Sequence, residues 1–93
     1  QTGDRAGAVA PAQEAVTLRR AQAAENRAYE PNLAMALNTL AAMLSETGDR
    51  AGAVAPAQEA VQLYELLVVG EPFRQPNLEW AQETLDGLLN GPE

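Results

Sequence analysis

Fifteen consecutive residues occur twice in this chain: the stretch TGDRAGAVAPAQEAV stands at positions 2–16 and again at 47–61, 45 residues later. The same spacing continues beyond the identical stretch, because Pro31-Asn32-Leu33 returns as Pro76-Asn77-Leu78. A fixed period of roughly 20–50 residues is typical of repeat proteins, in which each unit buries its apolar face only by stacking on a neighbour. The chain therefore consists of about two copies of one unit, beginning partway through the first.

Two residue types that carry much of protein chemistry are missing. The 93 residues include no cysteine and no histidine, which excludes disulfides, thiolate nucleophiles, imidazole bases and the usual zinc ligand sets. Glu79, Glu83 and Asp86 form an acidic row, but no base or nucleophile accompanies them. We expect a solvated face there, and we predict no catalysis, no metal and no cofactor.

The charge and hydropathy of the chain argue against two classes of partner, nucleic acids and membranes. A formal net charge of −7 opposes binding to nucleic acid, whose affinity for proteins comes largely from clustered Lys and Arg. No apolar run approaches the roughly 20 residues that a membrane span needs, so we expect a soluble, cytoplasmic protein with no membrane partner. All six basic residues are arginine, and together with the many alanines this favours a bacterial source.

Helix signals recur at the repeat spacing. Pro31 and Pro76 suit the first turn of a helix, and Gly48 followed by Asp49 predicts a tight link in which one helix ends and the next is capped. Asp4 is the corresponding cap of the first helix, in which Pro11 predicts a kink or a later start of the regular helix. These signals predict four helices at about 5–24, 32–46, 50–69 and 77–90. The second carries a continuous apolar stripe at Leu33, Ala36, Leu37, Leu40, Ala41 and Leu44.

The second unit resembles a known family. Its helix with Pro31-Asn32-Leu33-Ala34, its Gly48-Asp49-Arg50 turn and its second helix with Ala53 and Glu59-Ala60-Val61 are similar to the tetratricopeptide repeat, in the longer-period variety of kinesin light chains and bacterial regulatory proteins. The resemblance covers the whole chain, residues 1–93, as a single fragment. It implies an all-α solenoid of antiparallel helix pairs, with the four helices in the order B-A-B-A.

The resemblance also implies a binding surface. In this family the A helices line a concave groove, and a peptide or protein segment is expected to bind there. Asn38 is the central candidate, since a side-chain amide can pair with a peptide backbone as donor and acceptor; the alternative is a solvated residue beside the core. Trp80 is either a binding anchor or packs against the Phe73 loop or the neighbouring helix. The predicted groove residues are Met35, Asn38, Thr39, Ala42, Trp80, Glu83, Thr84 and Gly87.

The first helix raises a separate expectation. It carries small and apolar residues for a partner helix that the chain does not contain, and burying such a face favours self-association. The residues concerned are Ala8, Ala12, Ala15 and Leu18. We thus predict a non-catalytic protein–protein interaction module, part of a larger bacterial protein, that forms a homo-oligomer through residues 5–24. The alternative is a structural spacer or self-association element with no ligand in the groove.

Overall fold

The structure is a computed structural model that describes residues 2–91, with side chains from residue 7 onward. It is built from α-helices joined by short connections, two of which contain a 3-10 turn, and the described residues contain no β-strand. The predicted all-α class is confirmed. In chain order the elements are α1 (Thr2–Glu25), η1 (Arg27–Tyr29), α2 (Glu30–Glu46), α3 (Arg50–Gly70), η2 (Pro72–Arg74) and α4 (Gln75–Asn90).

The prolines act at the helix starts as expected. Pro31 and Pro76 each lie in the first turn of their helix, where the missing N–H has no acceptor to lose. The helices begin at Glu30 and Gln75, two residues earlier than predicted. The connections before them are not irregular loops but end in the 3-10 turns η1 and η2, and the side chain of Asn26 caps η1 by accepting from Ala28 N at 3.0 Å.

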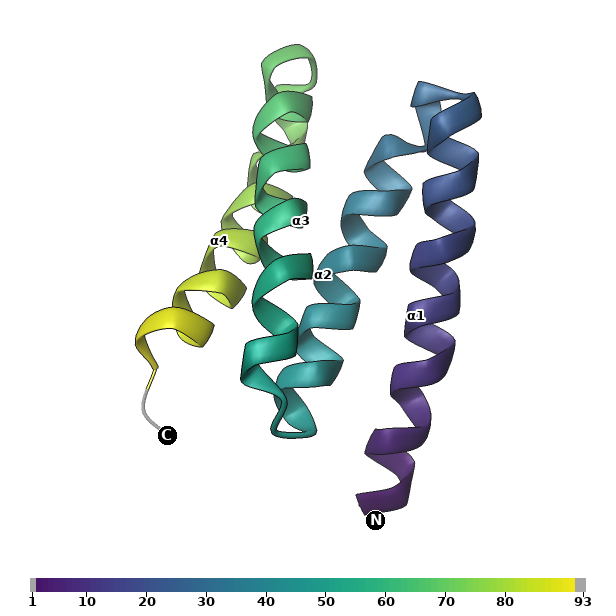
Figure 1. Cartoon of the computed structure of the whole chain (residues 1–93). Coiled ribbons are helices and arrows are strands. Elements are labelled where there is room, and N and C mark those ends of the chain that lie inside the picture. Colours follow the sequence, from purple (N-terminus) through teal and green to yellow (C-terminus); the bar gives the residue numbers. More distant parts are fainter. Residues whose placement is uncertain (1, 92–93) are drawn as a thin grey trace.

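The link between α2 and α3 is a tight turn that makes these two helices antiparallel (Figure 1). Gly48 takes a positive φ of 92°, a conformation that glycine adopts without steric cost. Asp49 then caps α3, its Oδ1 accepting from Gly52 N at 2.8 Å. Both expectations for this turn are confirmed.

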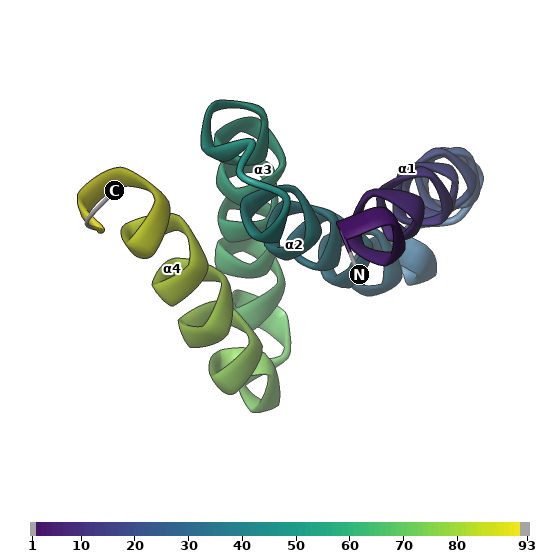
Figure 2. The same cartoon turned by 90° about the horizontal axis from the view of Figure 1, so that it is seen from below.

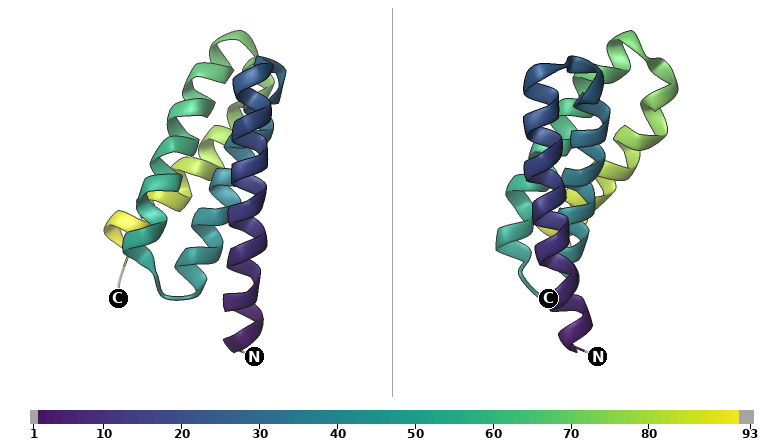
Figure 3. Two further views of the ribbon diagram at one scale, coloured as in Figure 1. Left: turned by 45° about the vertical axis from the view of Figure 1, so that its right-hand side comes forward. Right: turned by 90° about the vertical axis from the view of Figure 1, so that its right-hand side faces the viewer.

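The Thr-Gly-Asp sequence of this turn has a different structure in the first copy of the repeat. Thr2-Gly3-Asp4 lies inside α1, so the prediction that Asp4 caps this helix is wrong. The first turns of α1 extend past the α2–α3 turn (Figure 3). The side chain of Asp4 lies outside the described residues. Pro11 is accommodated within α1, which the structure assigns as one unbroken helix.

Helix α2 is the centre of the molecule. It contacts α1 on one side and both α3 and α4 on the other (Figures 1 and 2). The main core contains few large side chains, of which Leu37 and Tyr64 are the largest that are fully buried. Alanine fills much of the remaining contact surface, so the helices approach closely. The buried apolar residues are Val16, Leu33, Ala34, Leu37, Leu40, Ala41, Ala53, Ala57, Ala60, Val61, Tyr64, Leu78, Ala81 and Leu88.

Tyr64 carries a polar atom into this core. Only 1% of the residue is exposed, and its hydroxyl has no hydrogen-bond partner among the described residues. Burial raises the pKa of the phenol, against a smaller lowering effect of the positive charge of Arg74. An unpaired buried hydroxyl costs free energy, so Tyr64 stabilises the fold through its ring alone.

Tyr64→Phe should therefore raise the free energy of unfolding, by about 1 kcal/mol, as measured by urea denaturation at neutral pH. Because the pKa is raised in the folded state, the parent chain should lose stability as the pH rises above the ordinary tyrosine value of about 10. The variant should lack this part of the alkaline loss. A variant less stable than the parent at neutral pH would show that the hydroxyl has a partner in solution.

Candidate functional site

Two large apolar side chains are exposed at equivalent positions of α2 and α4. Met35 is 50% exposed and Trp80 is 39% exposed, and the repeat spacing relates one position to the other. The helices that carry them contact each other. Thr84 stands one turn beyond Trp80, half-buried, and its Oγ1 donates to the carbonyl of Trp80 at 3.1 Å.

The structure contradicts the prediction for Asn38. This residue is 0% exposed, so it is neither a groove residue that meets a peptide nor a solvated residue beside the core. Helix α2 is packed against α1, α3 and α4, which leaves only a narrow strip of its surface free. Within the described residues, neither Nδ2 nor Oδ1 of Asn38 has a hydrogen-bond partner.

Met35 and Thr39 lie in a depression that α2 shares with α1. Its volume is about 250 Å3, and its apolar wall includes Ala12 and Ala15 of α1. The structure thus brings two predicted groove residues together with two predicted self-association residues. It also adds Arg19, which the repeat could have revealed, because Arg19 occupies the position of the buried Tyr64. The lining is completed by Asn32 and Ala36.

Glu83 belongs to an acidic face of α4. It lines an open depression of about 440 Å3 with Glu79, Gln82 and Asp86, all four of which are exposed. Asp86 accepts from Asn90 Nδ2 at 2.7 Å. No group of acidic side chains among residues 2–91 has the arrangement that would hold a metal ion. The face therefore carries exposed negative charge. Of the other predicted groove residues, Ala42 is half-buried and Gly87 is exposed.

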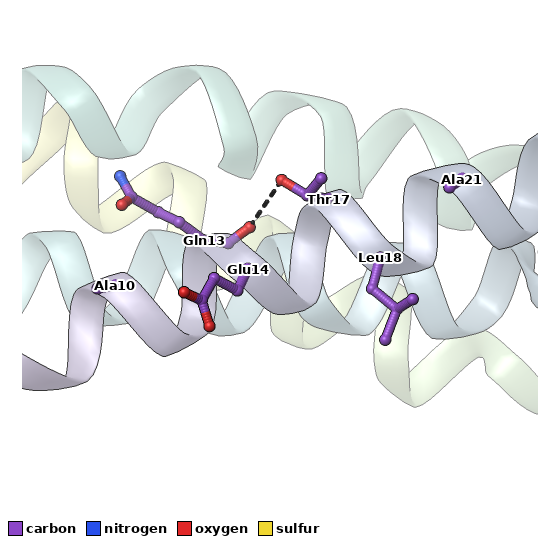
Figure 4. Close-up of a pocket in the computed structure, with 6 residues that line it drawn as sticks. All are labelled: Ala10, Gln13, Glu14, Thr17, Leu18 and Ala21. Carbon is purple, nitrogen blue, oxygen red and sulfur yellow. Dashed lines mark hydrogen bonds between the residues drawn. The ribbon is translucent and has the colours of Figure 1, made fainter.

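The outer side of α1 carries Leu18, which is 53% exposed. It lines an open surface depression of about 560 Å3 with Ala10, Gln13, Glu14, Thr17 and Ala21 (Figure 4). Of the other residues predicted for self-association, Ala8 and Ala15 are half-buried and Ala12 packs against the main core.

An ion pair connects α1 to α3. The guanidinium of Arg20 donates to both carboxylate oxygens of Glu59, with distances of 2.6 and 3.1 Å. This hydrogen bond raises the pKa of Arg20. Both side chains are substantially exposed, so the pair contributes little to stability.

Comparison with known protein families gives one match. Residues 33–69, which lie on α2 and α3, match the model of a family described as tetratricopeptide repeat. Neither the curated proteins nor the solved structures include a match to this chain. None of the helices in residues 2–91 combines the length and apolarity that crossing a membrane requires.

Proposed function

We propose, from the match of residues 33–69 to the tetratricopeptide repeat family, that the chain is a non-catalytic binding module of a larger, cytoplasmic bacterial protein. Tetratricopeptide repeats are protein–protein interaction modules in general. The finer question is which surface of this chain a partner contacts and what chemistry that partner has.

The observation that carries the proposal is the pair of exposed side chains Met35 and Trp80. Aromatic residues and methionine are enriched at protein interfaces. Here they stand at equivalent positions on two helices in contact. A peptide or protein segment that crosses α2 and α4 would bury both side chains at once. Thr39, Ala42 and Thr84 would contribute smaller contacts on the same helices.

The charge near Trp80 defines the partner further. Glu79 and Glu83 flank it on α4 and are exposed, and the net charge of the whole chain is −7. Like charges repel an acidic partner, and opposite charges speed association with a basic one. An indole ring also attracts a Lys or Arg side chain through its face. We therefore propose a partner segment with an apolar anchor flanked by basic residues.

Trp80→Ala should weaken binding of such a segment at least about tenfold, as expected when an aromatic anchor is removed. The probes are paired peptides that share one apolar anchor and carry either three Lys or three Glu, with affinity measured by calorimetry. In the parent chain, the fluorescence of Trp80, its one tryptophan, should report binding of the Lys peptide.

The matched control for this experiment is Val69→Ala, because Val69 is 81% exposed and lies on α3. The affinity of the Val69→Ala variant for the Lys peptide should equal that of the parent chain. Equal affinities for the Lys and Glu peptides would contradict the basic partner. Unchanged affinity in the Trp80 variant would place the site on another surface.

A second candidate function is structural self-association through α1. The observation that favours it is Leu18, whose repeat counterpart Leu63 packs against the main core whereas Leu18 is 53% exposed. A second copy of the chain that covers Ala8, Ala15 and Leu18 would bury this face. A monomeric mass by light scattering at high protein concentration would remove this candidate.

A further inference from the structure

We infer that α1 and α2 form an open seat for one more amphipathic helix, of the same pattern as α2 and with an acidic residue in its first turn. The seat is the 250 Å3 depression that includes Ala12, Ala15 and Arg19 of α1 and Ala36 of α2, extended along α1 to Leu18. Met35 and Thr39 of the proposed peptide surface also line this depression, but the inference concerns the packing of a helix and is tested without a peptide.

The second copy of the repeat shows what such a seat holds. Helices α3 and α4 pack against each other as α1 and α2 do, and α2 contacts both of them. The four residues that stand 45 positions after the seat residues are Ala57, Ala60, Tyr64 and Ala81. Each of these is at most 1% exposed. In the second copy, therefore, the equivalent positions lie under a packed helix, and that helix is α2.

The exposure of Leu18 and of its repeat counterpart Leu63 agrees with this comparison. Leu18 and Leu63 follow nearly identical stretches of sequence, so their local helical structure is the same. Leu63 packs against the main core, while Leu18 is 53% exposed. We attribute the difference between the two leucines to α2, which packs on α3 and has no counterpart on the outer side of α1 among the described residues.

Two observations define the chemistry of the occupant. One is the apolar face that α2 packs against α3, and the other is the replacement of Tyr64 in the second copy by Arg19 in the first. Leu33, Ala34 and Leu37 belong to the core that contains Ala60 and Tyr64, so the occupant needs an apolar face of this kind. Arg19 replaces Tyr64. An acidic residue would complement Arg19, whose guanidinium donates only to Gln22 Oε1, at 2.9 Å, among the described hydrogen bonds.

The acidic residue belongs in the first turn of the occupant. Tyr64 lines a small pocket with Pro31, Asn32 and Met35, which places the position of Arg19 beside the start of the seated helix. Glu30 stands in the first turn of α2, where a carboxylate also interacts favourably with the helix dipole. A helix of the α2 sequence thus brings the apolar face and a first-turn carboxylate, although in the chain itself Glu30 Oε2 lies 3.8 Å from Arg27 Nε, so that Arg19 would share this carboxylate with Arg27.

Helix α4 of a second copy fits the seat poorly. Three positions that carry Ala34, Leu37 and Ala41 in α2 carry Glu79, Gln82 and Asp86 in α4. All three of these α4 residues are exposed and polar. Placing two carboxylates against an alanine surface would strip them of water without hydrogen-bond partners. The occupant is therefore an α2-type helix rather than α4.

A fusion tests the seat. A copy of residues 27–45 is placed directly before Gln1. The last residue of the added segment, a copy of Ser45, is then followed by Gln1-Thr2-Gly3-Asp4. This junction reproduces the sequence around the α2–α3 turn, where Ser45 is followed by Glu46-Thr47-Gly48-Asp49. If the added helix occupies the seat, the melting temperature should rise by roughly 5 °C or more, a shift typical for a domain of this size when about one large side chain becomes buried. Hydrogen exchange of the α1 amides should slow at least about tenfold.

The matched control carries the α4 residues in the added segment alone, as Ala34→Glu, Leu37→Gln and Ala41→Asp. This fusion should show no rise in melting temperature and no added protection of α1. Equal behaviour of the two fusions would overturn the inference, because it would show that length rather than the apolar face matters. Leu18→Asp should leave the parent chain's melting temperature nearly unchanged and remove most of the gain in the first fusion.

The acidic residue is tested within the first fusion. Glu30→Gln in the added segment should lower the gain in melting temperature when Arg19 is present, and should have a smaller effect in an Arg19→Gln background, where only the contact of Glu30 with Arg27 is lost. Equal effects in both backgrounds would overturn the pairing with Arg19. A parent chain that is dimeric and already protected at Leu18 would overturn the assignment of the occupant and would favour a second copy of the chain instead.

Discussion

Leu37→Ala should lower the free energy of unfolding by about 2–5 kcal/mol, the range found when a buried leucine is truncated and its cavity does not collapse. Leu37 is 2% exposed and belongs to the main core on the central helix α2. In a domain of this size the loss corresponds to roughly 4–8 °C in melting temperature for each kcal/mol. Thermal denaturation followed by circular dichroism measures it.

The repeat supplies the matched control for this substitution. Gln82 occupies the equivalent position of α4 and is exposed, so Gln82→Ala should change stability by less than about 0.5 kcal/mol. Similar losses in the two variants would show that the face of α4 around Gln82 is covered in solution. A loss below about 1 kcal/mol for Leu37→Ala would contradict the central place of α2 in the core.

Ala60→Leu should destabilise the chain by about 1–3 kcal/mol, because Ala60 is 0% exposed and three further carbon atoms have no space there. It packs in the core with Leu33, Ala34 and Leu37 of α2. A larger side chain at position 60 therefore has to push helices apart or adopt a strained rotamer. Urea denaturation gives the change in free energy.

Comparing Ala15→Leu with Ala60→Leu separates the effect of the surrounding helices from the effect of local sequence. Ala15 and Ala60 stand in the same run of identical residues, so any difference between the two variants cannot come from local sequence. Ala15 is half-buried and lines the open depression between α1 and α2. Ala15→Leu should be close to neutral, within about 0.5 kcal/mol. Equal destabilisation at both positions would show that the depression is filled in solution.

The fold class could be predicted because the repeat and the helical periodicity can be read directly from the amino-acid sequence. The apolar stripe of α2, the prolines at the helix starts and the Gly48-Asp49 turn each specify one element without knowledge of its neighbours. Antiparallel packing of α2 and α3 then follows from the short link between them. The match of residues 33–69 to the tetratricopeptide repeat family agrees with these predictions.

The candidate site was less predictable, and Asn38 shows why. A polar residue beside an apolar stripe is normally placed towards solvent, and no local signal says that several helices will cover α2. The structure buries Asn38 completely. Conversely, Arg19 attracted no attention in the sequence, since its interest lies in its place beside Ala15 and Met35 in the depression.

The sequence alone determined that these 93 residues are built from helical repeats, that Gly48 and Asp49 form a turn, and that no cysteine or histidine is present among them. Tertiary structure decided what the identical letters do in each copy. Thr47-Gly48-Asp49 forms the turn that reverses the chain between α2 and α3, whereas Thr2-Gly3-Asp4 lies in the first turn of α1. Ala60 is fully buried and Ala15 is not, because burial depends on which helix is seated opposite, and no local sequence contains that information.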